Sequence, residues 1–561
     1  MIRVEDAGAK VGWDGLLGYN WRSGYDFTKL TDGLDMNQTY SSHYLQGRLY
    51  RSFKSPDALT GKWGNSVADV EAGWHAHPWD CLFSGDNSVW WWTSYGLDYT
   101  PFCPDLSETD YSKWFFDAVN AVRAGPGKLL LHAERDRGPV AVLYAQRDLF
   151  AAAIAAEKIE AGLLASDSNH LKQHEQFLHA VEDFGTQAHH LSVADLAAGE
   201  FTPADTRVLI LPLASCLSDE EVSVLREYVQ GGGTLLVDGR AGLLTGDGRI
   251  REARPLDELL GVNSQAGVGA VMTGGANGEG TVRGTIPGVA AAVDLDLAGL
   301  SLETIEPGLR ATTGTALGKV GETPILIVNK VGAGLAVTLN FSVLGIGAER
   351  ISADGGPLEQ IVGAVLKSAG VSAHCRMTRP DGSAPRVIEQ TLFTDGRTRY
   401  LALQHDFLSR VPAEGQDVRI TLPEPAIVYD VRAGRPVADG ALAEWDAYLA
   451  RGKPLLYALM PYTVDAVQVR APESASRGET MQLQVRVRAG EQRPGYHVVR
   501  MDVYAPGSDR PHREYSQNIA CTGGTGDATI PLALNDQAGN WRLSFRDVAS
   551  GVQTQTALSV Q

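Results

Sequence analysis

Three consecutive tryptophans stand at residues 90–92, in a stretch that reads DCLFSGDNSVWWWTSYG over residues 80–96. Aromatic side chains at the end of a strand can form a platform on which the apolar face of a sugar ring stacks, while nearby Asp and Asn side chains bind its hydroxyl groups. Because neighbouring residues on a strand point to opposite sides, Trp91 or Trp92 would face such a site. The alternative is that these tryptophans only pack between their strand and the helices that cover it.

Carboxylates near other predicted strands suggest acid and base chemistry. A pair of carboxyl groups can carry such chemistry, with one as a general acid and the other as a base or nucleophile. Asp14 lies at the tip of the segment KVGWDG, and Asp57 is the nearest carboxylate after LYRSF. Asp14 and Asp57 are therefore the catalytic candidates, with a turn or cap role as the alternative for each. The candidate sugar-binding residues are Asp35, Tyr40, Trp74, Trp79, Asp86, Trp91 and Trp92.

The elements that would position these residues are short apolar segments over residues 1–130, each followed by a polar or aromatic loop. The predicted parallel strands, with functional loops at their carboxyl ends, are KVGWDG, GLDMNQTY, GRLYRSF and the tryptophan stretch. A helix is predicted to follow in SETDYSKWFFDAVNAVRAG, with Ser107 as its N-cap and Gly125 beyond its end.

Residues 138–375 alternate between buried strands and amphipathic helices. The strand segments are GPVAVLYAQ, TRVLILPLA and TLLVDG, and the helical segments include HLKQHEQFLHAVEDFG and SDEEVSVLREYVQGGG. This alternation predicts a doubly wound parallel sheet of the flavodoxin-like type, with a Gly-rich β-excursion over residues 240–308. Residues 376–462 predict a small antiparallel β domain, and residues 463–561 predict an immunoglobulin-like β-sandwich.

The overall composition limits the partners. The 561-residue chain has a formal net charge of −18 at pH 7, which argues against nucleic acid as a partner, because proteins that bind it cluster Lys and Arg. The sequence contains no apolar run near the ~20 residues that span a bilayer. Its five cysteines are widely spaced, and His75 and His77 lack a third ligand, so neither a metal nor a cofactor is predicted. Cys81 and Cys103 are either bridged or free thiols.

The order of these segments resembles the glycoside hydrolase family 42 β-galactosidases, in which a (β/α)8 barrel precedes a trimerisation domain of glutamine-amidotransferase-like fold. GLDMNQTY is similar to the sixth barrel strand of that family, and SGDNSVWWWTSYG is similar to the eighth. VLILPLASCLSDEEVSVLREYVQGGGTLLVDGRAG is similar to part of the second domain. The resemblance covers roughly residues 1–375 and implies a carbohydrate substrate and a homotrimer or other homo-oligomer.

The resemblance also implies that residues 1–130 hold only the C-terminal half of a barrel, since about four strands precede the second domain and a barrel needs eight. We therefore expect an N-terminally truncated piece of a longer protein, or a barrel completed by another chain. The family's acid/base Glu would lie upstream of Met1, and the nucleophile Glu is absent after Phe53, at the end of the expected seventh strand LYRSF. Cys216 lies near the turn that carries the nucleophile in amidotransferases, but it lacks flanking glycines and is expected to be structural.

Two functions are consistent with these patterns. The first is the C-terminal portion of a glycoside hydrolase resembling β-galactosidases. This fragment alone is expected to be inactive. The alternative is a non-catalytic carbohydrate-binding or cell-surface scaffold that retains the fold without the carboxylate pair. The multidomain β-sandwich architecture favours a secreted or periplasmic protein, with a cytoplasmic one as the alternative.

Overall fold

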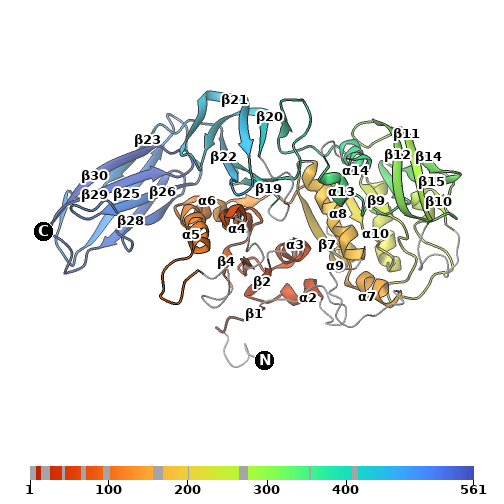
Figure 1. Cartoon of the computed structure of the whole chain (residues 1–561), viewed down its shortest axis with the longest axis horizontal. Helices are drawn as coiled ribbons and strands as arrows, with labels where there is room; N and C mark the ends of the chain where they lie inside the picture. Colours follow the sequence, from red (N-terminus) through yellow and green to blue (C-terminus); the bar gives the residue numbers. More distant parts are fainter. Residues whose placement is uncertain are drawn as a thin grey trace. The chain divides into compact units, whose positions relative to one another are not determined.

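The computed structural model describes residues 8–13, 26–40, 44–64, 71–91, 101–155, 169–199, 201–264, 276–352, 356–406 and 415–561. The chain folds into two compact units (Figure 1). Unit 1 comprises Met1–Ser66, Arg137–Ala373 and Arg386–Ile388, and unit 2 comprises Val67–Asp136, His374–Pro385 and Glu389–Gln561. Each unit is therefore assembled from segments that lie far apart in the sequence.

Unit 1 begins with parallel strands that alternate with helices. β1 (Gly12–Trp13) pairs with β2 (Met36–Tyr40), and β2 pairs with β3 (Leu59–Trp63). Between them lie α2 (Phe27–Thr31) and α3 (Tyr44–Phe53). The carboxyl ends of the three strands therefore meet at one edge of this sheet, as expected for KVGWDG and GLDMNQTY.

The prediction of a strand in GRLYRSF is wrong, because these residues form the second half of α3. Leu45 and Leu49 are both fully buried, and their spacing of four residues places them on the same side of a helix. The third strand is LTGKW instead, so the residue that follows it is Gly64 rather than Lys54.

The parallel part of the large sheet in unit 1 runs in the order β16-β9-β8-β6-β7. Its strands are β6 (Val140–Tyr144), β7 (Ala188–Ser192), β8 (Val208–Leu211), β9 (Thr234–Asp238) and β16 (Gly334–Leu339). The helices of this region are α7 (Gln146–Ala155), α8 (Asn169–Asp183), α9 (Val193–Ala198), α10 (Asp219–Gln230), α11 (Asp257–Leu260), α13 (Ile346–Arg350) and α14 (Pro357–Ser368).

Alternate residues of one strand enter different cores of this sheet. Val142 of β6 packs in one core with Phe177 of α8, whereas Leu143 packs in another with Leu225 of α10. Because neighbouring side chains on a strand point to opposite faces, α8 and α10 cover opposite faces of the sheet. This arrangement confirms the doubly wound parallel sheet.

The predicted β-excursion extends the same sheet to nine strands. β11 (Ala276–Ile286), β12 (Val293–Ile305), β14 (Thr315–Val320) and β15 (Thr323–Val331) pair antiparallel and join the parallel strands through β16. The short strands β10 (Val262–Asn263) and β13 (Arg310–Ala311) pair with each other. A Cβ atom at Gly280 would lie 2.8 Å from the side chain of Ile325, and one at Gly318 would lie 2.6 Å from that of Val282. The neighbouring strands therefore leave no room for a side chain at either position.

Unit 2 combines helices with an antiparallel sheet. Its first elements are α4 (Glu71–Phe83), β4 (Ser88–Trp90), α5 (Asp110–Arg123), α6 (Pro126–His132) and β5 (Glu134–Arg135). Its sheet is built from β17 (Arg376–Thr378), β18 (Ile388–Thr394), β19 (Arg399–His405), β20 (Gln416–Asp430), β21 (Arg435–Leu449) and β22 (Leu455–Met460), with β5 at one edge. The N-cap of α5 is Thr109, whose side chain accepts from the backbone N–H of Ser112, so the predicted cap at Ser107 is wrong by two residues.

The C-terminal part of unit 2 is a pair of β-sheets. One sheet has the order β23-β25-β28 and the other β24-β30-β29-β26-β27 (Figure 1). The strands are β23 (Ala466–Arg470), β24 (Ser474–Ala475), β25 (Thr480–Arg488), β26 (His497–Tyr504), β27 (Gln517–Cys521), β28 (Thr525–Pro531), β29 (Gly539–Asp547) and β30 (Gln553–Val560). Leu483 and Val485 of β25 share a core with Met501 of β26 and Phe545 of β29, so the two sheets pack face to face.

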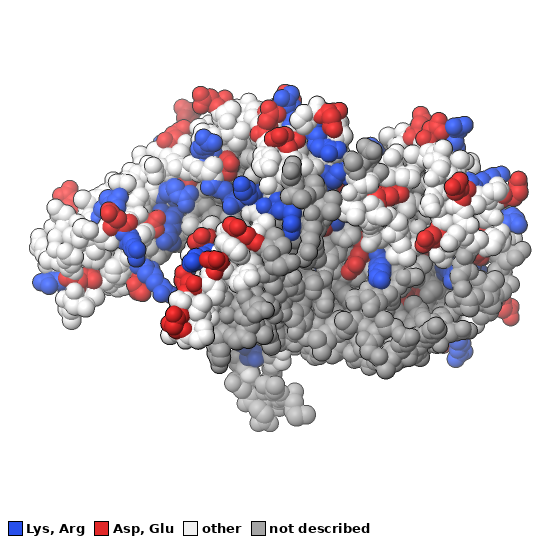
Figure 2. All heavy atoms as spheres, viewed as in Figure 1, with Lys and Arg blue, Asp and Glu red and all other residues white. Residues whose placement is uncertain are grey.

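The structure also describes the state of the cysteines, the length of the helices and the distribution of surface charge. All five cysteines are free thiols, which settles the open question for Cys81 and Cys103. In the part of the chain that the structure describes, none of the helices is long and apolar enough to cross a bilayer. Side chains of both signs are interspersed over the described surface in view, and Lys and Arg gather on unit 2 beside α5 and α6 (Figure 2).

Candidate functional site

The carboxyl edge of the β1-β2-β3 sheet is the first candidate site, because loops at this edge carry function in parallel β/α folds. Tyr40 at the end of β2 stands directly opposite Trp63 at the end of β3. Trp63 is half-buried, and Gly64 follows it. Two aromatic residues therefore end neighbouring strands, which is the arrangement expected for a surface that binds sugar rings.

Polar side chains occupy the face of this sheet that packs on α3. Thr39 donates from its hydroxyl to Gln46 Oε1 at 2.8 Å, and Gln46 Nε2 donates to the hydroxyl of Tyr50 at 3.0 Å. A Cβ atom at Gly47 of α3 would lie 3.6 Å from the buried Lys62. Thr39 and Lys62 therefore face the helix, and the alternation of a strand directs Gln38 and Trp63 to the opposite face.

Two predicted site residues lie at the other edge of the sheet. Asp35 precedes β2, where its carboxylate accepts from the backbone N–H of Val11 at 2.8 Å. Asp57 is exposed in the turn before β3. Because a strand rises about 3.3 Å per residue, Asp35 lies about 16 Å from the end of β2. Asp35 and Asp57 therefore begin strands instead of ending them, and the geometry gives neither a place at the carboxyl edge.

The predicted tryptophan platform is largely an internal cluster of unit 2. Trp74 of α4 is fully buried, and its ring stacks on that of Trp91 with centroids 4.4 Å apart and planes inclined by 12°. Phe115 of α5 meets Trp91 edge-on at 4.6 Å. Trp74 and Trp91 thus pack between β4 and the helices, which is the alternative that the sequence left open. Tyr40 is described only in its backbone, and Asp14 and Trp92 lie outside the described residues.

Asp86 and Trp79 occupy positions that the sequence did not predict. Asp86 is buried and precedes β4, so it lies at the beginning of that strand. Trp79 belongs to α4 and is almost fully buried, with the guanidinium carbon of Arg432 4.8 Å from the centroid of its ring. Both residues were candidates for sugar binding, and both are buried in unit 2.

A buried polar group on α4 was missed by the sequence analysis. His77, Asp80 and Cys81 bring one nitrogen, one oxygen and one sulfur within 4.8 Å of one another. Gln404 of β19 donates from Nε2 to Asp80 at 3.1 Å and to Glu389 of β18 at 2.9 Å. Such a donor set suits Zn²⁺, and the spacing His-x-x-Asp-Cys on one helix was the signal that could have identified it.

The carboxyl edge of the doubly wound sheet carries a second polar group, in unit 1. Asp148 at the start of α7 accepts from the backbone N–H of Cys216 at 2.6 Å and from the hydroxyl of Ser215 at 3.0 Å. Burial raises the pKa of Asp148 to about 7 and, together with the nearby Asp148 carboxylate, raises the pKa of Cys216 to about 12. The thiol of Cys216 is therefore protonated at neutral pH, which agrees with a structural role and not with a nucleophile.

Comparison with known proteins identifies the fold. No protein-family model matches this chain, and no curated protein matches its sequence. A β-galactosidase from Bacillus circulans sp. alkalophilus is 16% identical in sequence, with a TM-score of 0.59, over 82% of this chain and 64% of that one. A β-galactosidase from Rahnella sp. R3 is 14% identical, with a TM-score of 0.56, over 82% of this chain and 65% of that one.

A third structure of the same kind is Gan42B, a GH42 β-galactosidase from G. stearothermophilus, in a catalytic-mutant form. It is 13% identical, with a TM-score of 0.55, over 78% of this chain and 61% of that one. The chain thus has a fold like that of the GH42 β-galactosidases over most of its length, while it spans less than two thirds of the length of these structures. The resemblance expected from the sequence is confirmed at the level of the fold.

Proposed function

We propose that this chain is part of a glycoside hydrolase that resembles the GH42 β-galactosidases and acts on glycosidic bonds of carbohydrates. The observation that carries the proposal is the likeness of its fold to a β-galactosidase over 82% of the chain. The fold alone does not imply the chemistry, so the proposal also needs a site at which a sugar can bind.

We place that site at the carboxyl edge of the β1-β2-β3 sheet. Trp63 ends β3 there, opposite the end of β2, and its half-buried ring offers aromatic surface for a sugar ring. Asp14 follows β1 directly in the sequence, as the residue after Trp13, and it is the catalytic candidate that this topology favours over Asp57. A carboxylate at this edge is where a general acid or base would meet the glycosidic oxygen.

A specific observation favours the second candidate, a carbohydrate-binding protein without hydrolytic activity. Among the described residues that end β2 and β3, or follow β3 directly, there is no carboxylate: they are Tyr40, Trp63 and Gly64. A protein with this edge could retain sugar binding and lack the carboxyl pair that hydrolysis requires.

Two variants at opposite edges of the sheet test the proposal. In the complete polypeptide that contains this chain, Asp14→Asn should lower the rate of β-galactoside hydrolysis by about 10²–10⁴, as expected for a general acid or base, and should leave sugar binding intact. Asp57→Asn is the matched control and should leave the rate unchanged, because Asp57 lies at the amino edge. Equal rates in Asp14→Asn and the unaltered protein would refute the role of Asp14.

The measurement that separates the two functions is a comparison of turnover with binding. Hydrolysis of β-galactosides supports the first function, while binding of galactosides without turnover, weakened by Trp63→Ala, supports the second. Tyr448→Ala is the control for Trp63→Ala, because Tyr448 is an aromatic residue of β21 with half of its surface exposed. Neither binding nor turnover on a broad panel of glycans would refute both.

We also propose the domain identities that the sequence predicts, with boundaries at 1–130, 138–375, 376–462 and 463–561. The doubly wound sheet with helices on both faces supports an amidotransferase-like trimerisation domain, and the paired antiparallel sheets support an immunoglobulin-like sandwich. Light scattering after size-exclusion chromatography should give the mass of a homotrimer, and a monomer at micromolar concentration would refute the oligomerisation role.

A further inference from the structure

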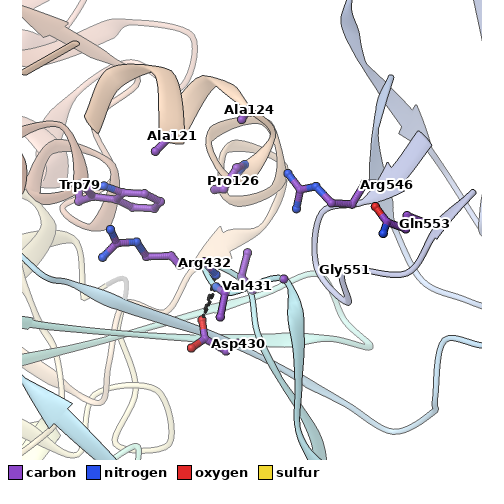
Figure 3. A pocket seen from close by; sticks show the side chains of 12 residues that line it. Trp79, Ala121, Ala124, Pro126, Asp430, Val431, Arg432, Arg546, Gly551 and Gln553 are labelled. Carbon is purple, nitrogen blue, oxygen red and sulfur yellow. Dashed lines mark hydrogen bonds between the residues drawn. The ribbon is translucent and has the colours of Figure 1, made fainter. Parts of the chain in front are cut away.

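Unit 2 contains a cavity of about 640 Å³ that is separate from the carboxyl edge of the first sheet. Four parts of the unit surround it: helix α4 through Trp79, helices α5 and α6, the turn between β20 and β21, and the turn between β29 and β30 (Figure 3). A volume of this size is within the range of small-molecule binding sites.

Two guanidinium groups give the cavity its charge. Arg432 is held in place, because it lies over the ring of Trp79 and donates to the backbone carbonyl of Pro454. Arg546 points into the cavity toward Pro126 (Figure 3). Among the described residues, the side chain of Arg546 has no hydrogen-bond or ion-pair partner. The cavity thus contains two guanidinium groups: that of Arg432, which is held by other residues, and that of Arg546, which is available to a ligand.

The only carboxylate among the residues that line the cavity is already committed. Asp430 Oδ1 accepts from the backbone N–H groups of Arg432 at 3.0 Å and Ala433 at 2.9 Å, which closes the turn between β20 and β21 (Figure 3). Among the described residues Asp430 forms no ion pair with Arg546, and the lining of the cavity holds two arginines and one carboxylate. The positive charge of the cavity therefore favours a ligand with a negative group.

The two turns are fixed against each other by close backbone contact. A Cβ atom at Gly551 would lie 1.8 Å from the carbonyl oxygen of Gly434, and Gly551 has a φ of +81° that favours glycine. Its backbone N–H donates to the carbonyl of Asp547 at 2.8 Å, and Asp547 is fully buried. The wall that carries Arg546 is therefore already ordered before a ligand arrives, which lowers the entropy cost of binding.

The opposite wall is apolar. Ala121 and Ala124 of the α5 region and Pro126 of α6 face the cavity, beside the ring of Trp79 (Figure 3). Small apolar side chains next to an aromatic ring suit the apolar face of a sugar, while guanidinium forks match carboxylate or sulfate oxygens in pairs.

From this combination we propose that the cavity binds an anionic saccharide, with its carboxylate or sulfate on Arg546 and its ring against the apolar wall. The anionic group follows from Arg546, which points into the cavity, whereas the saccharide class rests on the proposed function. The site is a second one, distinct from the strand edge where turnover is proposed.

Titration calorimetry with the full chain tests the proposal. Galacturonate or galactose 6-sulfate should bind at least tenfold more tightly than galactose, and the tighter of the two identifies the anionic group. Arg546→Gln should lower this affinity at least tenfold, and Arg546→Lys should lower it less, because lysine keeps the charge without the fork. Arg542→Gln, an exposed position on the same strand β29, should leave binding unchanged.

Three results would overturn the proposal. Equal affinities for galactose and galacturonate would remove the role of the anionic group. Unchanged affinity in Arg546→Gln, with a melting temperature like that of Arg542→Gln, would place any binding elsewhere. Inorganic sulfate that binds as tightly as galactose 6-sulfate would leave a simple anion site without a saccharide. If Trp63→Ala loses galactose binding while Arg546→Gln keeps it, the result concerns the strand-edge site of the proposed function and not the cavity.

Discussion

A buried ion pair in the C-terminal sandwich offers the sharpest test of the structure. His497 and Asp547 are both fully buried, with Nδ1 and Oδ1 2.8 Å apart. Asp547 Oδ2 also accepts from the backbone N–H of Ser550 at 2.9 Å, and His497 Nε2 lies 3.0 Å from the hydroxyl of Tyr462. The pair thus ties β26 to β29 and to the turn that carries Gly551 beside the cavity.

The variant Asp547→Asn should destabilise the sandwich by about 3 kcal/mol at pH 6. Removal of one partner of a buried pair costs about 3–5 kcal/mol, and the lower end applies because a neutral His497 can still donate to the Asn oxygen. The new amide N–H₂ group would face the N–H of Ser550, so this donor would lose its acceptor.

The pH dependence has a definite sign. Burial opposes the charged imidazolium, but the Asp547 carboxylate and its hydrogen bond more than offset this, so the pKa of His497 is raised. Its contribution is therefore complete below the unfolded pKa of about 6.5 and is lost as the pH rises through the folded pKa. Burial raises the pKa of Asp547, but His497 and Ser550 hold it below its usual value, so this contribution is lost in acid.

In Asp547→Asn the contribution of His497 to stability changes with pH in the opposite direction. Without the carboxylate, burial alone lowers the pKa of His497 in the folded state, so the stability of the variant should rise with pH up to about 6.5. The stability of the unaltered protein should instead fall above that pH.

Hydrogen exchange followed by mass spectrometry measures the effect locally, in peptides that cover β26 and β29, at pH 5, 6, 7 and 8. Asp527→Asn on the exposed face of β28 is the control and should change the opening free energy by less than about 0.5 kcal/mol. A change below 1 kcal/mol in Asp547→Asn, or the same pH slope in both proteins, would refute the reasoning.

Three further variants test other parts of the fold. Burial raises the pKa of Asp148 to about 7, so the unaltered unit 1 should lose up to about 4 kcal/mol as the pH rises from 4 to 7, and Asp148→Asn should flatten that slope in urea titrations; equal slopes would contradict it. Arg48→Met should cost about 3–5 kcal/mol because it strands the buried Glu182, and the double variant with Glu182→Gln should recover part of this loss. Phe115→Ala should cost about 3–5 kcal/mol in thermal melts, whereas Asp117→Ala on the exposed side of α5 should cost almost nothing.

Elements with a long, regular pattern were predictable from the sequence. The buried run of β6 and the helix α10, with its capping box of Ser218 and Glu221, lie where the periodicity and the cap residues predict them. Their stabilising interactions are largely local or repeat along the element, so a short window of sequence contains them.

Short segments were less predictable. GRLYRSF is compatible with a strand over its seven residues, and only its burial within unit 1 decides for a helix. Because GRLYRSF is a helix, the third strand is LTGKW, and Asp57 lies before that strand instead of after one. The side of the sheet on which a carboxylate lies depends on strand boundaries, which propensity alone fixes poorly.

The sequence by itself determined the doubly wound sheet, the terminal β-strands and the resemblance in fold, because each follows from local patterning and chain order. Only the tertiary structure decided that Trp74 and Trp91 cover each other, that Gln404 joins Asp80 to Glu389, and that Arg432 and Arg546 line one cavity. These residues lie tens to hundreds of positions apart, and their contacts arise from the packing of whole elements, which no local pattern encodes.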